Sequence, residues 1–362
     1  MRSLPAREVR LVIFPRFCKI LPGEFQAVNK RSGSPEKGAF ERAKRSETAP
    51  SSELPRSELY TNQHSKDCKS PLHAGKWPVL REEYSVFQEL APNVFDNSYH
   101  PHRPPHPGDI VAAFTQQGVL KTPQGGFYRF SDLGGAPPSA FTHLLAVGSV
   151  AVYGCDAEIV QALHPDAAIM PLRRLRTYQP QWLAFAIATA SHLAHWYRTH
   201  RFCGACAAPM RSSLTERALI CTACGLTVYP RISPAVIVAI HSGERLLLTH
   251  NPGLPPAVRW ALVAGYVEIG ETPEDTVHRE VAEEVSLKVK NLRYIRSQPW
   301  AFTQSLLLGY SAELDGSDEI KIDGVELDEA HWFARQNLPP IPNTVTLTNT
   351  LITAFKDRTL PE

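Results

Sequence analysis

The segment from Gly265 to Leu287, with the sequence GYVEIGETPEDTVHREVAEEVSL, constrains the fold of this chain more than any other. It predicts a glycine-containing turn followed by a helix. Thr272 is a favourable residue just before a helix, and Pro273 suits the first helical position. We therefore expect a helix that runs from Pro273 to Val285.

Three glutamates, Glu280, Glu283 and Glu284, fall within an arc of about 100° on that helix, next to a stripe of valines. Carboxylates this close repel one another, so a cation is expected to bind between them. Hard oxygen ligands of this kind suit Mg²⁺ or Mn²⁺. The alternative is a solvated acidic face, which is the better interpretation for an isolated E-x-x-E-E pattern.

The wider spacing favours the metal site. Gly265, Glu271 and the run from Arg279 to Leu287 together resemble the Nudix box, the signature of the Nudix hydrolases. The resemblance implies that Glu280, Glu283 and Glu284 are catalytic metal ligands and that Arg279 pairs with Glu271.

One position of the box differs, because Ser286 stands where the family usually has glycine. A left-handed conformation is expected there, at the C-terminal end of the helix, and glycine adopts it most easily. Serine should therefore reduce local stability by up to about 1 kcal/mol without affecting the metal ligands.

Two Cys-x-x-Cys pairs form the second strong motif. Cys203 and Cys206 are followed, after fourteen residues, by Cys221 and Cys224. This pattern predicts a tetrahedral zinc site on two tight turns, and four thiolates leave no open position, so the zinc should be structural. Three scattered cysteines among seven do not suggest a disulfide framework, which favours a reducing compartment, and we expect a cytoplasmic protein.

The chain divides into four parts by composition and motif. Residues 1–92 form a basic, Pro- and Ser-containing extension that we expect to be disordered, residues 93–200 a mixed α/β domain, residues 201–231 the Cys₄ zinc ribbon, and residues 232–362 a Nudix α/β/α sandwich. The fold class is α+β. No run of 18 apolar residues occurs, so we expect no membrane span.

A third motif narrows the substrate. Residues 297–305, SQPWAFTQS, resemble SQPWPFPxS of the NADH pyrophosphatase (NudC-type) branch of Nudix hydrolases, with Ala301 and Thr303 in place of two prolines. The order of N-terminal domain, Cys₄ ribbon and Nudix domain agrees with that branch. Pro299 predicts an irregular turn here rather than a central strand.

The resemblance implies hydrolysis of NAD(H) to AMP and nicotinamide mononucleotide, removal of NAD caps from RNA, and a homodimer. It implies Glu326 as a further ligand of Mg²⁺ or Mn²⁺. Aromatic rings could stack on the flat heterocycles of such a substrate, and amide or hydroxyl groups could form hydrogen bonds with it. Trp300 and Phe302 could equally be core residues. The expected substrate-binding residues are Tyr229, Tyr266, Ser297, Gln298, Trp300, Phe302, Ser305 and Thr348.

Two alternatives stay open. Loss of the prolines at Ala301 and Thr303 motivates a Nudix hydrolase of ADP-ribose or another nucleoside diphosphate derivative. A zinc-ribbon nucleic-acid-binding protein with an inactive Nudix domain is disfavoured, because binding alone does not need clustered carboxylates. The basic excess also belongs to the extension, since residues 1–82 contain 16 Lys and Arg against 9 Asp and Glu, whereas the remainder is acidic.

Overall fold

The computed structural model describes residues 86–360, apart from 253–259, 323, 325 and 341–344. The described residues belong to one compact unit, Lys76–Glu362. Most of the predicted extension lies outside them. Val86, Phe87 and Leu90 are nevertheless buried, so the packed chain begins before residue 92, where the extension was predicted to end.

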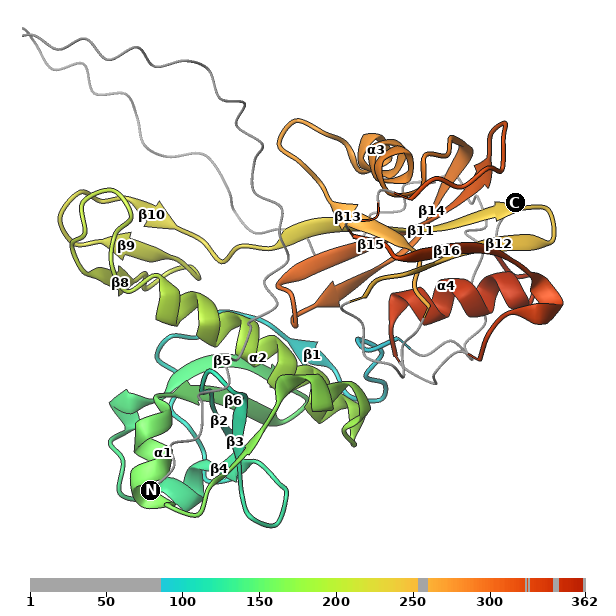
Figure 1. The fold of residues 1–362 in the computed structure, drawn as a ribbon. Coiled ribbons are helices and arrows are strands. Elements are labelled where there is room, and N and C mark those ends of the chain that lie inside the picture. The colour runs from blue at the N-terminus through green and yellow to red at the C-terminus, as the bar shows by residue number, and fades with distance from the viewer. Residues whose placement is uncertain (1–85, 253–259, 323, 325, 341–344, 361–362) are drawn as a thin grey trace, which may run out of the picture. The chain divides into compact units, whose positions relative to one another are not determined.

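The C-terminal part is built on a six-stranded sheet in the order β14-β15-β11-β12-β16, with β13 paired to β11 (Figure 1). Strands β11 and β15 are parallel, and the other pairings are antiparallel. The elements are β11 (Ser233–Ser242), β12 (Arg245–His250), β13 (Val263–Tyr266), α3 (Pro273–Val285), β14 (Val289–Trp300), β15 (Ser305–Leu314), β16 (Glu329–Ala334) and α4 (Leu347–Lys356).

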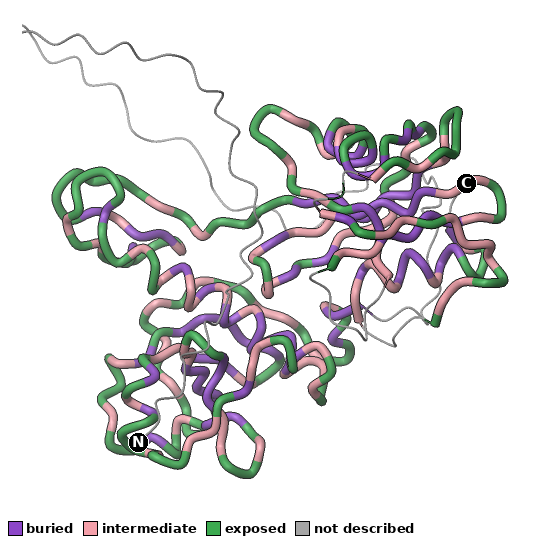
Figure 2. Tube along the Cα trace, viewed as in Figure 1, coloured by how far each residue is buried: buried purple, intermediate pink, exposed green. Residues whose placement is uncertain are grey.

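Helices α3 and α4 cover opposite faces of this sheet. Successive side chains of β11 point to opposite faces because a strand has a two-residue period. Val236 and Val238 pack in the same core as Val281 of α3, whereas Ile237 packs in a separate core with Leu351 of α4. The buried strands between the two helices are visible in Figure 2. This arrangement confirms the predicted α/β/α sandwich.

Helix α3 has the predicted limits. The Thr272 hydroxyl accepts a hydrogen bond from the Asp275 amide at 3.1 Å, and the Asp275 carboxylate accepts one from the Thr272 amide at 3.2 Å. This reciprocal capping fixes the first turn. The helix ends where Ser286 adopts φ 56° and ψ 29°, the left-handed conformation expected at that position.

The prediction for Pro299 was correct only in part, because Pro299 lies outside the central strands, as expected, but not in an irregular turn. Pro299 lies within β14, opposite Leu306 of β15, and the irregular turn comes after Trp300. Strand β14 lies at the edge of the sheet, where the missing amide of a proline interrupts no ladder on its outer side.

The N-terminal part contains a five-stranded sheet in the order β1-β5-β6-β2-β4 and a separate β3-β7 pair. Helix α2 (Gln181–Thr199) packs on this sheet. The other elements are β1 (Phe95–Asp96), β2 (Ile110–Ala113), β3 (Val119–Lys121), β4 (Tyr128–Arg129), β5 (Thr142–Val147), β6 (Val150–Cys155), α1 (Ala157–Leu163) and β7 (Ala168–Met170). Short 3₁₀ helices span Phe130–Leu133, Pro138–Ala140, Leu172–Thr177 and Arg335–Asn337.

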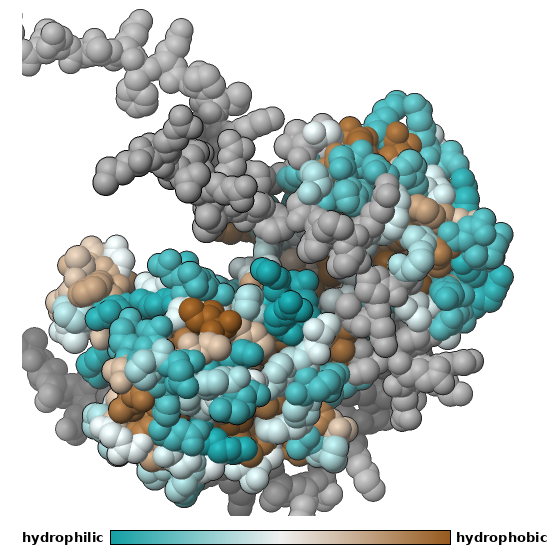
Figure 3. Space-filling model, turned by 60° about the horizontal axis from the view of Figure 1, so that its bottom comes forward, coloured by the Kyte–Doolittle hydropathy of each residue, from teal (hydrophilic) through white to brown (hydrophobic). Residues whose placement is uncertain are grey.

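In the sequence between these parts, β8 (Met210–Ser212), β9 (Leu219–Cys221) and β10 (Thr227–Val228) form a small three-stranded sheet in the order β10-β9-β8. The mixture of helices and antiparallel strands confirms the α+β class. Hydrophobic residues occur on the face drawn in Figure 3 mostly as small patches among hydrophilic ones. In the described part of the chain, every helix is too short or too polar to cross a membrane.

Candidate functional site

The three glutamates of α3 divide into two buried side chains and one exposed side chain. Glu280 is 4% exposed and Glu284 is 5% exposed, whereas the Glu283 side chain is 41% exposed. Burial of a carboxylate is costly unless charge or hydrogen bonds compensate it. Two buried carboxylates one helical turn apart therefore indicate a site that is built to hold positive charge.

Gly265 of β13 makes room for one of them. A Cβ atom at this position would lie 2.0 Å from both Cδ and Oε1 of Glu280, a separation that atoms do not adopt. The Glu280 carboxylate therefore lies directly against the β13 backbone. This contact explains why the turn before α3 carries glycine at this position.

Arg279 connects the turn to the helix. Its Nε and Nη2 atoms donate to the two carboxylate oxygens of Glu271 at 2.6 and 2.8 Å, which is the predicted pair in bidentate form. Nη2 also donates to the Tyr266 carbonyl at 2.9 Å. Nη1 donates to Glu280 at 2.6 Å and to Glu283 at 3.3 Å, contacts that the sequence did not predict.

These hydrogen bonds fix the charge of Glu271. The hydrogen bonds from Arg279 stabilise the ionised form of the Glu271 carboxyl most. Hydrogen bonds from the Glu268 amide and the Thr276 hydroxyl stabilise it further. Together they lower the pKa of Glu271 to about 2. The pKa of Arg279 is raised, chiefly by the same hydrogen bonds to Glu271. The pair stays fully ionised at neutral pH.

Three carboxylates on one face of α3 are oxygen donors of the kind that a hard divalent cation prefers. Among the described residues, however, only the four cysteines of the ribbon lie close enough together to form a ready metal site. Two of these carboxylates, Glu280 and Glu283, share Arg279 Nη1 in this structure. A cation at both would replace that guanidinium contact. Glu326 is half-buried, and the adjacent Leu327 packs in the same core as the α3 valines.

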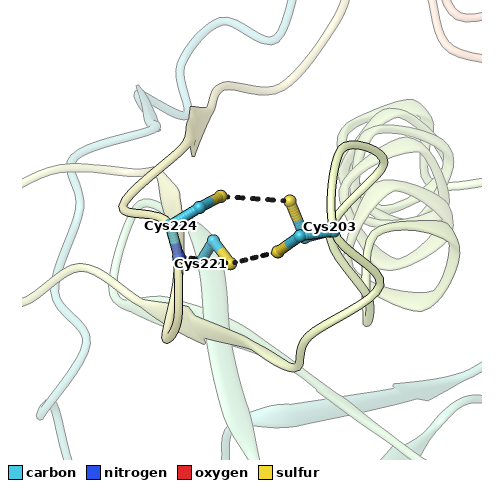
Figure 4. Close-up of side chains that lie close together, drawn as sticks. Cys203, Cys221 and Cys224 are labelled. Carbon is cyan, nitrogen blue, oxygen red and sulfur yellow. Dashed lines mark hydrogen bonds between the residues drawn. The ribbon is translucent and has the colours of Figure 1, made fainter. Parts of the chain in front are cut away.

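The four cysteines of the ribbon form a second, separate site. Their sulfur atoms all lie within 4.8 Å of one another, with Cys203 Sγ 3.7 Å from Cys224 Sγ and Cys206 Sγ 3.4 Å from Cys221 Sγ (Figure 4). Tetrahedral zinc with Zn–S bonds of about 2.3 Å places sulfurs about 3.8 Å apart. The cysteines therefore fit a structural zinc ion, as predicted.

Backbone amides prepare one of these thiols for metal binding. The amides of Cys224 and Ala223 each donate to Cys221 Sγ at 3.4 Å, and they lower the pKa of Cys221 to about 6. Metal coordination requires the thiolate, so this turn favours the ligating form before any ion binds.

Two known domain families match the segments of the chain that carry these sites. Residues 198–229 match the NADH pyrophosphatase zinc ribbon domain, and residues 231–351 match the NUDIX domain. The NAD-capped RNA hydrolase NudC of Chromobacterium violaceum is 43% identical over 189 residues, which cover 52% of this chain and 71% of that protein. This chain belongs to the NudC family of Nudix hydrolases.

A second NudC-family relative, the NAD-capped RNA hydrolase NudC of Salmonella agona, is 49% identical over 160 residues. That alignment covers 44% of this chain and 62% of the relative, so this chain spans less than two thirds of the length of the Salmonella protein. The two domain matches cover the parts of the chain that carry the two sites.

Within the NudC-type motif, Gln298 is fully buried and already hydrogen-bonded at both ends of its amide. Its Nε2 donates to the Val345 carbonyl at 2.8 Å, and its Oε1 accepts from the Leu347 amide at 2.8 Å. Gln298 was predicted to bind substrate. In this structure it instead ties strand β14 to the first turn of α4, where the predicted Thr348 lies half-buried.

Of the two motif aromatics, Trp300 is buried and Phe302 is half-buried against the same core. Trp300 is 8% exposed and contacts Phe302 edge to face at a ring separation of 4.7 Å, in a core that also contains Phe87. The Arg176 guanidinium lies 5.0 Å from the Trp300 ring and 5.1 Å from the Phe302 ring. Arg176 was not found from the sequence, because nothing in its local pattern marks it.

The remaining predicted substrate residues lie at different depths. The exposed Tyr266 ring meets Ser305, whose hydroxyl lies 3.4 Å from the Tyr266 hydroxyl, so the structure brings these two together. Exposed Tyr229 donates to Glu216 at 3.1 Å. The Ser297 carbonyl accepts from Gln88 at 2.9 Å.

Proposed function

We propose that this protein hydrolyses the diphosphate bond of NAD(H) to AMP and nicotinamide mononucleotide, and that it removes NAD caps from RNA by the same reaction. The observation that carries the proposal is the pair of buried carboxylates on one helix face, Glu284 and Glu280, of which Glu280 lies against Gly265. The names of the relatives support the choice of substrate.

The metal would be Mg²⁺ or Mn²⁺, held by Glu280, Glu283, Glu284 and Glu326. When bound, such an ion neutralises the diphosphate oxygens and lowers the pKa of an attacking water. Both cations prefer carboxylate oxygens, and the site contains no thiol or imidazole among these four ligands.

The chain's own part in the reaction is to hold these carboxylates in place. Arg279 joins Glu271 of the turn to the helix, so the turn cannot move away from α3 without breaking two charge-assisted hydrogen bonds. Because Glu271 has a pKa of about 2, this brace does not loosen anywhere near neutral pH.

Substrate contact is assigned first to Tyr266, and the Ser305 hydroxyl, which is buried, lies beside the Tyr266 hydroxyl. Tyr266 is 47% exposed and lies on β13, the strand that also carries Gly265, so its ring is available to stack on a nicotinamide or adenine group. Gln298, Trp300 and Phe302 support the site from within the fold. Tyr229, Ser297 and Thr348 remain proposed contacts.

Two further properties belong to the proposal. We expect a homodimer, as the family resemblance implies. We also expect a cytoplasmic location, since four of the seven cysteines are arranged as metal ligands and the described Cys155 is a free thiol.

A substrate panel tests the proposal. Purified protein with Mg²⁺ or Mn²⁺ would be incubated with NADH, NAD⁺, ADP-ribose or NAD-capped RNA, and the products would be separated by chromatography. We expect AMP and reduced nicotinamide mononucleotide from NADH. Turnover of ADP-ribose without turnover of NADH would instead favour the second Nudix activity, for which Ala301 and Thr303 are the sequence reason.

A further inference from the structure

The segment from Arg198 to Ile232, which contains the zinc ribbon, is strongly basic. It holds five arginines and a single carboxylate, Glu216, and it contains no lysine or aspartate. The acidic balance of the chain beyond residue 82 therefore conceals this basic segment. The five arginines are Arg198, Arg201, Arg211, Arg217 and Arg231.

These arginines are not neutralised inside the protein. In the described part of the chain, none of the five forms an ion pair with a carboxylate, whereas several arginines of the Nudix domain do. Arg201, Arg211 and Arg231 are exposed. The paired arginines of the Nudix domain are Arg245, Arg279, Arg296, Arg335 and Arg358.

Next to two of the unpaired arginines lies a pocket of about 280 Å³, between the end of α2 and strand β8. Tyr197, His200 and Phe202 bring aromatic rings to it, and Arg201 brings charge. Phe202 is 63% exposed, although it is large and apolar. The Met210 amide donates to the Arg201 carbonyl at 3.0 Å, which holds β8 and its exposed Arg211 beside this pocket.

The size and lining of the pocket indicate which class of ligand it could bind. Pockets that enclose a complete drug-sized molecule measure roughly 300–1,000 Å³. The ribbon pocket, at about 280 Å³, lies at the lower end of this range and has room for a planar ring system. Exposed aromatic rings beside unpaired arginines are the features with which proteins hold single-stranded nucleic acid, because bases stack on the rings and phosphates meet the guanidinium groups.

We propose that the ribbon pocket binds the single-stranded RNA body of a NAD-capped substrate, with one base stacked on Phe202 and backbone phosphates bound by Arg201 and Arg211. This inference rests on the proposed function and adds to it a site for the part of the substrate that is not cut. Charge complementarity favours RNA over a protein partner, because the segment offers five cations and one anion.

The first test compares two substrates in one variant. Phe202→Ala should lower kcat/KM for a NAD-capped single-stranded RNA by about tenfold, as expected for loss of one stacked base. The same variant should hydrolyse NADH at the wild-type rate, because NADH has no RNA body. Leu214→Ala is the matched control, since Leu214 is 66% exposed on the same ribbon and does not line the pocket. It should change neither rate.

The second test uses salt. For single strands, each phosphate contact contributes about 0.7 to the slope of log affinity against log salt concentration. Arg201→Gln and Arg211→Gln should each reduce the salt slope of kcat/KM for capped RNA by about that amount, with no effect on NADH. Fluorescence anisotropy with an uncapped single-stranded RNA measures the same slopes without any turnover.

The outcomes separate this inference from the proposed function. If wild-type protein hydrolyses neither substrate but binds uncapped RNA through Phe202, the hydrolysis proposal fails and the RNA site stands. Equal rates for wild type and Phe202→Ala on capped RNA would overturn the RNA site. Equal loss on NADH and capped RNA, together with a change in molecular mass by light scattering, would instead show that a second copy of the chain occupies this face.

Discussion

At residue scale, the site depends on one position that has no side chain. Any other residue at position 265 would place carbon 2.0 Å from the Glu280 carboxylate. Gly265→Ala should therefore displace Glu280 and lower kcat/KM for NADH by about 100-fold, because errors of about 1 Å in a reacting constellation have effects of that size. Steady-state kinetics measures this.

The matched control is Gly108→Ala, since a Cβ at Gly108 meets no atom within 4 Å and the change should leave kinetics unaltered. Wild-type kcat/KM in Gly265→Ala would show that Glu280 does not need its place against β13.

The Glu271 pair predicts a dependence of stability on pH. The pKa of Glu271 is about 2 in the folded chain and about 4.3 in an unfolded chain. Because the folded pKa is depressed, the stabilising contribution is complete above about pH 4.3 and is lost as pH falls towards 2. The difference in urea midpoint between wild type and Glu271→Gln should thus be constant from pH 7 to 5 and should shrink between pH 4.3 and 2.5.

Both proteins contain the same other titrating groups, so the difference isolates Glu271. A difference that stays constant down to pH 2.5 would mean that Arg279 does not hold this carboxylate ionised.

At the scale of single elements, helix α3 ends less favourably than it could. Ser286 adopts φ 56°, a conformation that glycine reaches without the steric penalty of a Cβ atom. Ser286→Gly should raise the free energy of unfolding by about 1 kcal/mol or less, measured by urea denaturation. Ser286→Ala keeps the penalty and should give no gain. An equal gain in both variants would mean that removal of the hydroxyl is responsible.

The ribbon is the other element with a direct test. Four thiols within 4.8 Å of one another should bind one zinc ion per chain, measured by elemental analysis of purified protein. Cys221→Ser should lower that content to near zero, because one of four ligands is lost. Cys155→Ser is the control, since Cys155 lies outside the ribbon, and should retain zinc. A wild-type zinc content near zero would refute the ribbon site.

At the scale of the whole molecule, the features predicted correctly are those that depend on residues close together in the sequence. The limits of α3 follow from Thr272, Pro273 and the left-handed Ser286, which are neighbours in sequence. The cysteine cluster follows in the same way, because two short turns supply all four ligands. Side chains within short stretches of sequence were therefore sufficient to predict the limits of α3 and the cysteine cluster.

Long-range packing was not predicted. Gln298 bonds to Val345 and Leu347, about 50 residues away, so its sequence neighbourhood gave no sign that its amide is occupied. Trp300 packs in a core with Phe87, and Pro299 is tolerated because β14 is an edge strand. Each of these facts depends on how the sheet and the N-terminal part are assembled.

The most direct test of the central claim is the formation of AMP and reduced nicotinamide mononucleotide from NADH by wild type and by Glu284→Gln, with Mg²⁺ or Mn²⁺ present. We expect both products from wild type. Glu284→Gln should lower the rate by more than about 100-fold, with zinc content and circular dichroism unchanged, since loss of a metal ligand has a larger effect than loss of an outer hydrogen bond. Equal rates in the two proteins, or no AMP from wild type, would contradict a diphosphatase site on α3.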